Sequence, residues 1–210
     1  MIEQGSPEWH ATRCGKVTAS RISDMLAKTK TGWGAGRSNY KAQLVAERLT
    51  GVVAESFTSV AMQWGTDTEA EARNTYAFYC DADVEQVGFV THSEITMSGA
   101  SPDGLIGNDG LVEIKCPNTA THIKTLLGGA IPGEYRLQMM WQMACTGRKW
   151  CDFVSYDPRM PEDMRMFVSR LDRCDKSIAD LEAEVRSFLA EVDATVSDLV
   201  SKYRHQQAAE

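Results

Sequence analysis

Apolar and polar positions follow a helical period at the start of the chain. In "GSPEWHATR", Ser6 and Pro7 are typical of a helix start, with the serine as the N-cap and the proline at the first helical position. The stretch "TASRISDMLAKT" repeats this signal, with Thr18 or Ser20 as the cap. We therefore expect two short helices to open the chain.

Two longer helices are predicted over residues 40–50 and 59–80, where apolar side chains recur at helical spacing. The stretch "KTKTGWGAGRSN" at residues 28–39 is rich in Gly, Lys and Arg and has little periodicity. Such composition predicts a mobile basic loop.

The period changes after residue 80. The stretches "EQVGFVTHS", "ITMSGASPD", "GLIG" and "LVEIKC" are short and either β-branched or punctuated by glycine, which predicts a run of antiparallel strands. The turn "GNDG" at residues 107–110 has residues that tolerate positive φ, so it predicts a hairpin between the last two strands.

Two helices, two strands and one long helix are predicted in the rest of the chain. The helices are "TATHIKTLLGG" and "EYRLQMMWQMACTG", and the strands are "KWCDFVSYD" and "MRMFVSRLD". The long helix spans about residues 172–203, and its apolar stripe predicts packing on its own domain. The stripe consists of Ile178, Leu181, Val185, Leu189, Val192, Val196, Leu199 and Tyr203.

Length and composition favour one α/β domain over residues 1–210, since 43% of the residues are hydrophobic. No apolar run approaches the roughly 20 residues that cross a bilayer, and the N-terminus lacks the pattern of a signal peptide. We expect a soluble, cytoplasmic protein without a membrane partner. The six cysteines form no CxxC pair, which predicts reduced thiols and no zinc ribbon.

Charge is unevenly distributed. The chain has a net charge of -7, yet its first 50 residues carry eight Lys or Arg against four Asp or Glu. This asymmetry permits a positive groove on an acidic protein, although a solvated charged face has the same pattern.

The predicted hairpin carries the candidate chemistry. Because side chains two apart on a strand share a face, Glu113 and Lys115 project together, and the preceding strand can bring Asp103 opposite them. Two carboxylates suit Mg²⁺, and an adjacent ammonium can orient a metal-bound water. The group is suited to metal-assisted phosphodiester hydrolysis. Alternatively, Glu113 and Lys115 are a solvent-facing pair and Asp103 is a turn residue.

Several blocks in the same order resemble the lambda exonuclease family of phage recombination nucleases. These nucleases are related to the YqaJ-type viral recombinases in the PD-(D/E)xK superfamily. The blocks are "EQGSPEWHATRCGKVTAS", "MQWGTDTEAEAR", "SPDG" with "VEIKCP", "YRLQMMWQM" and "YDPRM". The resemblance implies a restriction-endonuclease-like core with a central mixed sheet flanked by helices.

The resemblance also implies an activity and partners. It implies a Mg²⁺-dependent exonuclease, with Mn²⁺ able to substitute, that degrades the 5′ strand of linear double-stranded DNA to mononucleotides. The remaining 3′ strand would serve a single-strand annealing protein. The enzyme would be a homotrimeric ring, encoded by a phage or prophage and acting in the bacterial host cell.

Site residues follow from the matched motifs. Asp103 and Glu113 would be metal ligands with the backbone carbonyl of Ile114, and Lys115 would assist the attacking water. Glu69 and Gln138 match further residues of the family site. The "QWG" lead-in favours Glu69, although Glu71 lies beside it and Glu69 could instead be a carboxylate on the helix surface. The family often has a second glutamine two positions after Gln138, where this chain has Met140.

DNA contacts are implied in the same way. Arg13 and Ser20 would bind the terminal 5′-phosphate, and Trp9 could wall that pocket. Lys30 would engage entering DNA, and Met62 would be an apolar wedge at the terminal pairs. From the residues alone, Arg13 could be a surface charge, Ser20 a cap, and Trp9 and Met62 core residues.

Three other functions compete. A restriction-type or junction endonuclease would share the carboxylates and the lysine but would not need a 5′-phosphate pocket. An iron-sulfur nuclease would need four cysteines around the site, and the spacings here do not match. A DNA-end-binding scaffold protein would be expected to have lost a ligand or the lysine.

Overall fold

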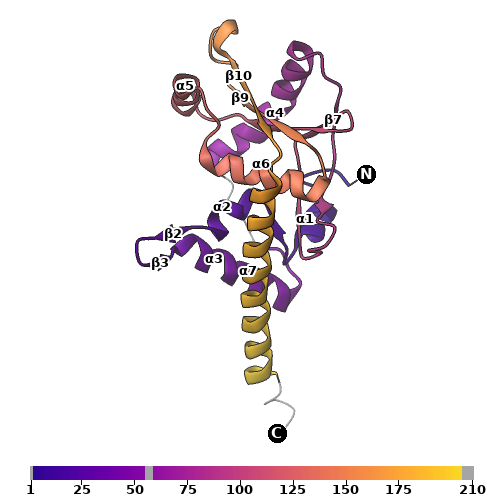
Figure 1. Ribbon diagram of the computed structural model, residues 1–210, viewed down its shortest axis with the longest axis vertical. Coiled ribbons are helices and arrows are strands. Elements are labelled where there is room, and N and C mark those ends of the chain that lie inside the picture. Colours follow the sequence, from indigo (N-terminus) through magenta and orange to yellow (C-terminus); the bar gives the residue numbers. More distant parts are fainter. Residues whose placement is uncertain (1, 55–58, 205–210) are drawn as a thin grey trace.

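A five-stranded mixed sheet lies at the centre of the computed structural model, which describes residues 2–54 and 59–204 (Figure 1). Strands β8 and β9 run parallel, whereas the other neighbouring pairs are antiparallel. The strand order is β10 (Met166–Asp172), β9 (Trp150–Tyr156), β8 (Gly110–Lys115), β7 (Gly104–Ile106) and β4 (Val84–Glu85). The predicted α/β class with a central mixed sheet is confirmed.

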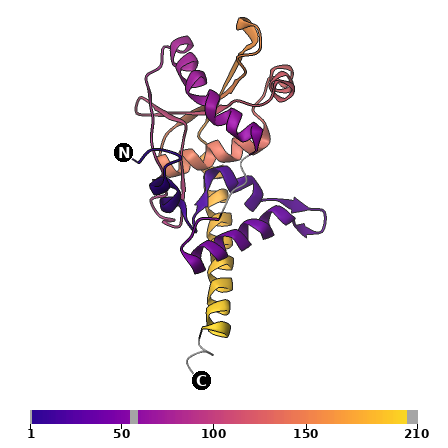
Figure 2. The same ribbon diagram turned by 180° about the vertical axis from the view of Figure 1, so that it is seen from behind.

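Helices cover both faces of this sheet (Figures 1 and 2). Leu111 of β8 belongs to a buried cluster that includes residues of α6 (Gly133–Thr146). The next residue, Val112, belongs to a second cluster with Tyr76 of α4 (Val60–Tyr79). Alternate residues of β8 therefore face different helical layers, as the period of a strand requires.

The predicted run of antiparallel strands is confirmed in its pairings, but the run is divided between two sheets, and each sheet also has a parallel pair that the prediction did not include. A second sheet of three strands has the order β1 (Val17–Thr18), β6 (Ser98–Ala100) and β5 (Val90–Thr91), and β1 runs parallel to β6. In the central sheet, β8 is parallel to β9 because α5 (Thr119–Gly128) and α6 form the crossover between them. Parallel partners come from distant parts of the chain, so the local pattern does not reveal them.

The predicted hairpin between β7 and β8 is confirmed, with Gly104 opposite Val112. Both glycines of its turn are needed. Gly107 has a φ of 50°, and a Cβ at Gly110 would lie 2.2 Å from the ring of Trp150.

The first predicted helix is confirmed as α1 (Pro7–Arg13), and the Oγ of Ser6 accepts the N–H of Trp9. The second is shorter than expected. It consists of one 3₁₀ turn, Ala19–Arg21, followed by α2 (Ile22–Met25), and neither the Thr18 nor the Ser20 side chain caps it.

The loop predicted over residues 28–39 is wrong. It forms a hairpin of β2 (Lys28–Thr29) and β3 (Gly32–Trp33), and α3 (Ala35–Thr50) begins directly after it. The Trp33 ring lies 4.7 Å from the Lys28 ammonium and 3.9 Å from the Arg37 guanidinium. These cation–π contacts order a segment whose composition is typical of a loop.

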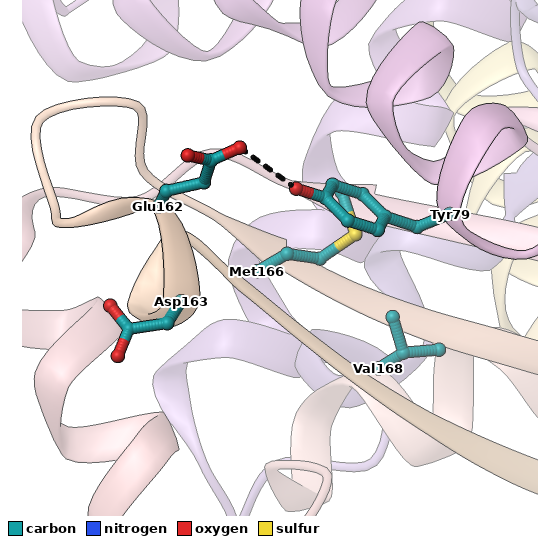
Figure 3. Close-up of a pocket in the computed structure, with 5 residues that line it drawn as sticks. All are labelled: Tyr79, Glu162, Asp163, Met166 and Val168. Atoms are coloured by element: carbon teal, nitrogen blue, oxygen red, sulfur yellow. Dashed lines mark hydrogen bonds between the residues drawn. The ribbon is translucent and has the colours of Figure 1, made fainter.

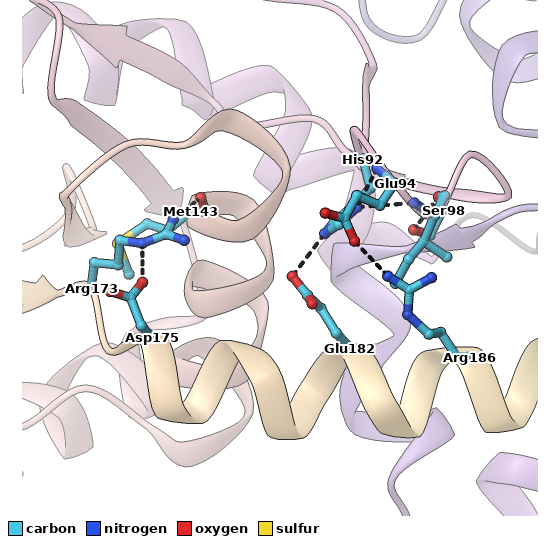
Figure 4. A network of polar contacts seen from close by, with 9 residues as sticks. His92, Glu94, Ser98, Met143, Arg173, Asp175, Glu182 and Arg186 are labelled. Carbon is cyan, nitrogen blue, oxygen red and sulfur yellow. Dashed lines mark hydrogen bonds and ion pairs between the residues drawn. The ribbon is translucent and has the colours of Figure 1, made fainter.

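The long helix α7 (Asp175–Tyr203) packs on its own domain, as predicted, through buried residues from Ile178 to Val192. Tyr203 departs from the predicted stripe because it is 67% exposed, where the last turns extend beyond the body of the molecule (Figure 1). Polar contacts also fix the helix (Figure 4): Glu182 pairs with the buried His92, and Arg186 pairs with Glu94.

Within the ranges 2–54 and 59–204, no helix combines the length and the apolar character that crossing a membrane demands.

An ion pair between the buried Asp152 and the half-exposed Arg170, on the face of the sheet that α4 covers, should contribute measurably to stability. Asp152 is 4% exposed, accepts two hydrogen bonds from Arg170 and accepts the hydroxyl of Tyr76 at 2.7 Å. We expect Asp152→Ala to lower the free energy of unfolding by about 2 to 3 kcal/mol, because both donors lose their partner. Urea denaturation measures this change. The exposed Asp109, paired with Lys149, is the control, and Asp109→Ala should cost less than about 1 kcal/mol. Equal effects of the two substitutions would contradict the prediction.

Candidate active site

The hairpin brings Asp103 to the strand that carries Glu113. Asp103 directly precedes β7, and its Oδ2 accepts the backbone N–H of Ile114 at 2.6 Å. Glu113 is 0% exposed, so the alternative of a solvent-facing Glu113–Lys115 pair is wrong.

Three donors surround the Glu113 carboxylate. Gln138 of α6 donates from Nε2 to Oε1 at 2.6 Å, and the Lys115 ammonium forms an ion pair with the same oxygen. Gln142, one helical turn further along α6, donates to Oε2. Glu113 therefore lies between the sheet and α6 with both oxygens engaged.

Electrostatics couple these groups. Burial, together with the nearby Glu113 carboxylate, raises the pKa of Asp103 well above its usual range. Burial alone would lower the pKa of Lys115, but the Glu113 and Asp103 carboxylates together raise it. Because the Glu113 carboxylate disfavours ionisation of Asp103, a cation between the two carboxylates would be favoured at this edge of the sheet.

Glu69, and not Glu71, faces this group. Burial raises the pKa of Glu69, with Arg73 opposing the shift and Glu113 adding to it. Arg73 pairs with Glu69 and donates to the backbone carbonyl of Asp103 at 3.1 Å. Glu71 instead accepts the hydroxyl of Tyr156 at 2.7 Å, away from the hairpin.

The donor set fits a hard cation that retains water. In the described parts of the chain, no group of three or more His, Cys, Asp or Glu is placed to hold a metal ion. Asp103 and Glu113 supply two carboxylates, which is the number that Mg²⁺ commonly takes from a protein while keeping waters and phosphate oxygens. The carbonyl of Ile114 as a third ligand stays a prediction.

Arg13 is a half-buried cation next to this hairpin. Its guanidinium lies 3.8 Å from the centre of the Trp9 ring, and Trp9 donates from Nε1 to the Oγ of Ser101 at 2.9 Å. Ser101 is two residues before Asp103, so α1 is connected to the carboxylate hairpin. Within residues 2–54 and 59–204, the Arg13 side chain forms no hydrogen bond or ion pair, which leaves its donors available to an anion. Burial lowers the pKa of Arg13.

The remaining predicted DNA contacts lie on the surface. Ser20 is exposed in the 3₁₀ turn, and Lys30 is exposed at the tip of the β2–β3 hairpin, which projects from the body (Figure 2). Met62 is 54% exposed in the first turn of α4, so it is not a core residue. Their roles in DNA binding stay predictions.

Comparison with known proteins now identifies the family. A model of the YqaJ-like viral recombinase domain matches residues 8–149. The chain belongs to the YqaJ-like viral recombinase family. A search of curated proteins gave no match.

Two solved structures of one exonuclease cover nearly all of this YqaJ-like chain. They are alkaline exonuclease LHK-Exo from Laribacter hongkongensis and LHK-Exo in complex with dAMP. Both are 49% identical to this chain and cover 96% of it and 100% of their own chains, with TM-scores of 0.89 and 0.90. These matches support a nuclease role in phage recombination.

A distant match shows the fold alone. A phage-related exonuclease from Haemophilus somnus 129PT is 14% identical, covers 88% of this chain and 96% of its own, and has a TM-score of 0.69. The YqaJ-like chain thus has the fold of phage exonucleases of the PD-(D/E)xK type.

Gln142 is the residue that sequence reasoning missed. The second glutamine was expected at the position of Met140, but Met140 is buried in the apolar core. Gln142 is four residues after Gln138, and residues four apart on a helix share a face. That spacing was the signal that could have identified it.

A surface groove lies away from these residues. It has a volume of about 760 Å³, and it is lined by Tyr79, Glu162, Asp163, Met166 and Val168 (Figure 3). The two acidic residues belong to the 3₁₀ turn Glu162–Met164 before β10. None of the predicted site residues lines this groove, so the carboxylates and not a cavity mark the candidate site.

Proposed function

We propose that this YqaJ-like recombinase is a Mg²⁺-dependent exonuclease that hydrolyses the 5′ strand of linear double-stranded DNA. It would release 5′-mononucleotides and leave a 3′ single strand for annealing. The observation that carries the proposal is the buried Glu113 carboxylate, with Asp103 next to it and Lys115 paired to it. LHK-Exo, at 49% identity, is described as an exonuclease and was crystallised with dAMP, a mononucleotide.

In this proposal, Asp103 and Glu113 hold the cation together with the carbonyl of Ile114, and Mn²⁺ can replace Mg²⁺ because it accepts the same oxygen ligands. The bound ion would stabilise the charge that develops on the scissile phosphate and acidify a water. The Lys115 ammonium, fixed by Glu113, orients the attacking water through its N–H donors. Gln138 keeps the Glu113 carboxylate in place, and Glu69 adds negative charge at the edge of the site.

The DNA end would be held by the N-terminal part of the chain. Arg13 supports this assignment because it is a half-buried cation on the Trp9 ring, and Trp9 donates to Ser101, two residues before Asp103. Arg13 and Ser20 would bind the 5′-phosphate, Met62 would separate the terminal pairs, and Lys30 would contact the duplex. Such phosphate contacts should weaken steeply as salt rises.

We also propose a homotrimeric ring around the duplex and a single-strand annealing protein as partner in the cytoplasm of the bacterial host. The excess of basic residues in the first 50 positions supports DNA in such a channel. Sedimentation of a monomer at working concentration would exclude the ring.

The test uses linear duplexes labelled on each strand, with either 5′-phosphate or 5′-hydroxyl ends, and Mg²⁺. We expect mononucleotides from the 5′ strand only, faster from phosphorylated ends, and none from closed circular DNA. Arg13→Ala should reduce the preference for phosphate about tenfold or more, since a charge-assisted hydrogen bond is lost.

Arg186→Ala is the matched control, because this exposed arginine of α7 pairs only with Glu94 among the described residues. It should leave the preference for phosphate unchanged. Internal cuts in circular DNA would favour the endonuclease alternative, and binding without cleavage would favour the end-binding scaffold.

A further inference from the structure

Gln142 differs from the other partners of Glu113 in its burial. It is 0% exposed, whereas the Lys115 side chain is 28% exposed and Gln138 is only partly buried. The two partly exposed donors share Oε1 of Glu113, and Gln142 alone takes Oε2. Gln142 therefore holds Oε2 from inside the core, whereas the two donors to Oε1 are partly exposed.

We propose that Gln142 is a positioning residue that fixes the plane of the Glu113 carboxylate for cation binding. The inference rests on the proposed metal-dependent function and extends it to a residue that acts only through Glu113. An ionised carboxylate accepts about four hydrogen bonds. Oε1 has two donors and Oε2 has one, so the acceptor direction that remains belongs to Oε2, the oxygen that Gln142 holds.

The orientation of the Gln142 amide is determined by its two neighbours. A carboxylate only accepts, so the amide must present Nε2 to Glu113 and Oε1 to the opposite side. There the thiol of Cys151 lies 3.8 Å from Oε1 and donates to it. Cys151 is 0% exposed on β9, the strand parallel to β8. The chain Cys151, Gln142, Glu113 is thus ordered by hydrogen bonds inside the core.

Rotation of the amide would place its oxygen against the carboxylate, and removal of the amide would leave Oε2 of Glu113 buried without a donor. Either change would allow the Glu113 carboxylate to rotate about its side-chain torsion. Loss of an outer hydrogen bond to a metal ligand typically lowers metal affinity about 10-fold to 100-fold.

The experiment measures Mn²⁺ binding directly, from the electron paramagnetic resonance signal of free Mn²⁺, without DNA. We expect Gln142→Leu to weaken Mn²⁺ binding about 10-fold to 100-fold. The Mg²⁺ concentration for half-maximal exonuclease activity should rise by a similar factor, while kcat at saturating Mg²⁺ falls less. Gln142→Asn, one methylene shorter, cannot reach Glu113 and should behave similarly, so it serves if the leucine variant does not fold.

Met140→Leu is the control, because Met140 is buried on the same helix without contacting Glu113 by a hydrogen bond. It should bind Mn²⁺ as the unaltered protein does.

A folded Gln142 variant with unchanged Mn²⁺ affinity would overturn the positioning role of Gln142 and leave the proposed exonuclease function in place. If the unaltered protein binds Mn²⁺ but does not degrade DNA, the proposed exonuclease fails and the positioning role stands. If the unaltered protein binds no Mn²⁺, both fail.

Discussion

Lys115→Ala should reduce kcat on linear duplex DNA by about 10² to 10³-fold at saturating Mg²⁺. The Lys115 ammonium pairs with Glu113 at the candidate site. Removing one charged donor that acts on the developing transition state typically costs that factor. The Lys115→Arg variant should also have low exonuclease activity, since a planar guanidinium presents its donors in a different geometry.

The effect must be separated from loss of folding. Lys115→Ala leaves Glu113 with Gln138 and Gln142 as partners, so the carboxylate keeps two hydrogen bonds. We expect a cooperative thermal transition at a lower temperature than that of the unaltered protein, because the buried Glu113 loses its cationic partner, so activity is measured below that transition. Lys124→Ala, at an exposed position of α5, is the matched control and should retain full activity. Activity of Lys115→Ala within threefold of the control would remove Lys115 from the mechanism.

Much of the fold was predictable because its signals are local. The "GNDG" turn, the face shared by Glu113 and Lys115 and the helix start at Ser6 all depend on residues a few positions apart. The β2–β3 hairpin was not predictable, because Trp33 lies against Arg37, which is itself held by Phe188 and Glu191 of the distant helix α7. Composition alone gives that segment the character of a loop.

In the candidate site, too, some residues could be placed from local signals and others depend on contacts between distant parts of the chain. Asp103, Glu113 and Lys115 belong to one hairpin, so the sequence places them together. Gln142 could be placed beside Gln138 from their spacing of four on one helix, whereas Cys151 contacts Gln142 only because β9 pairs in parallel with β8, which no local pattern encodes. Choosing Glu69 over Glu71 likewise depends on helix orientation: Arg73, which pairs with Glu69, donates to the backbone carbonyl of Asp103, whereas Glu71 accepts from Tyr156.

The second large effect concerns Asp103, where activity and stability should move in opposite directions. Asp103→Asn should lower kcat/KM with Mg²⁺ by about 10³-fold, equivalent to about 4 kcal/mol, because one anionic ligand is lost. The asparagine oxygen can still accept the N–H of Ile114, so the hairpin is retained. The exonuclease assay on 5′-phosphorylated duplexes measures the loss.

Stability without metal should rise in the same variant. The pKa of Asp103 is raised in the folded protein, mainly by burial and also by Glu113, so the unfolded chain loses this proton at lower pH. The carboxylate therefore destabilises the fold increasingly as pH rises from the unfolded pKa of about 4 through the folded value. Asp103→Asn removes this term, and its urea midpoint in EDTA should exceed that of the unaltered protein at pH 7, with a smaller difference at pH 4.

Added Mg²⁺ supplies the decisive comparison. It should stabilise the unaltered protein, since a ligand that binds only the folded state raises its stability, and it should have little effect on Asp103→Asn. If Asp103→Asn is less stable than the unaltered protein in EDTA, the prediction is wrong. The hydrogen bond from Ile114 to the Asp103 carboxylate would then stabilise the fold by more than burial of the charge destabilises it. Equal stabilisation of both proteins by Mg²⁺ would place the cation elsewhere. Two results together would show that the Asp103 carboxylate destabilises the fold and binds the metal. These are a higher stability of Asp103→Asn in EDTA and stabilisation by Mg²⁺ of the unaltered protein alone.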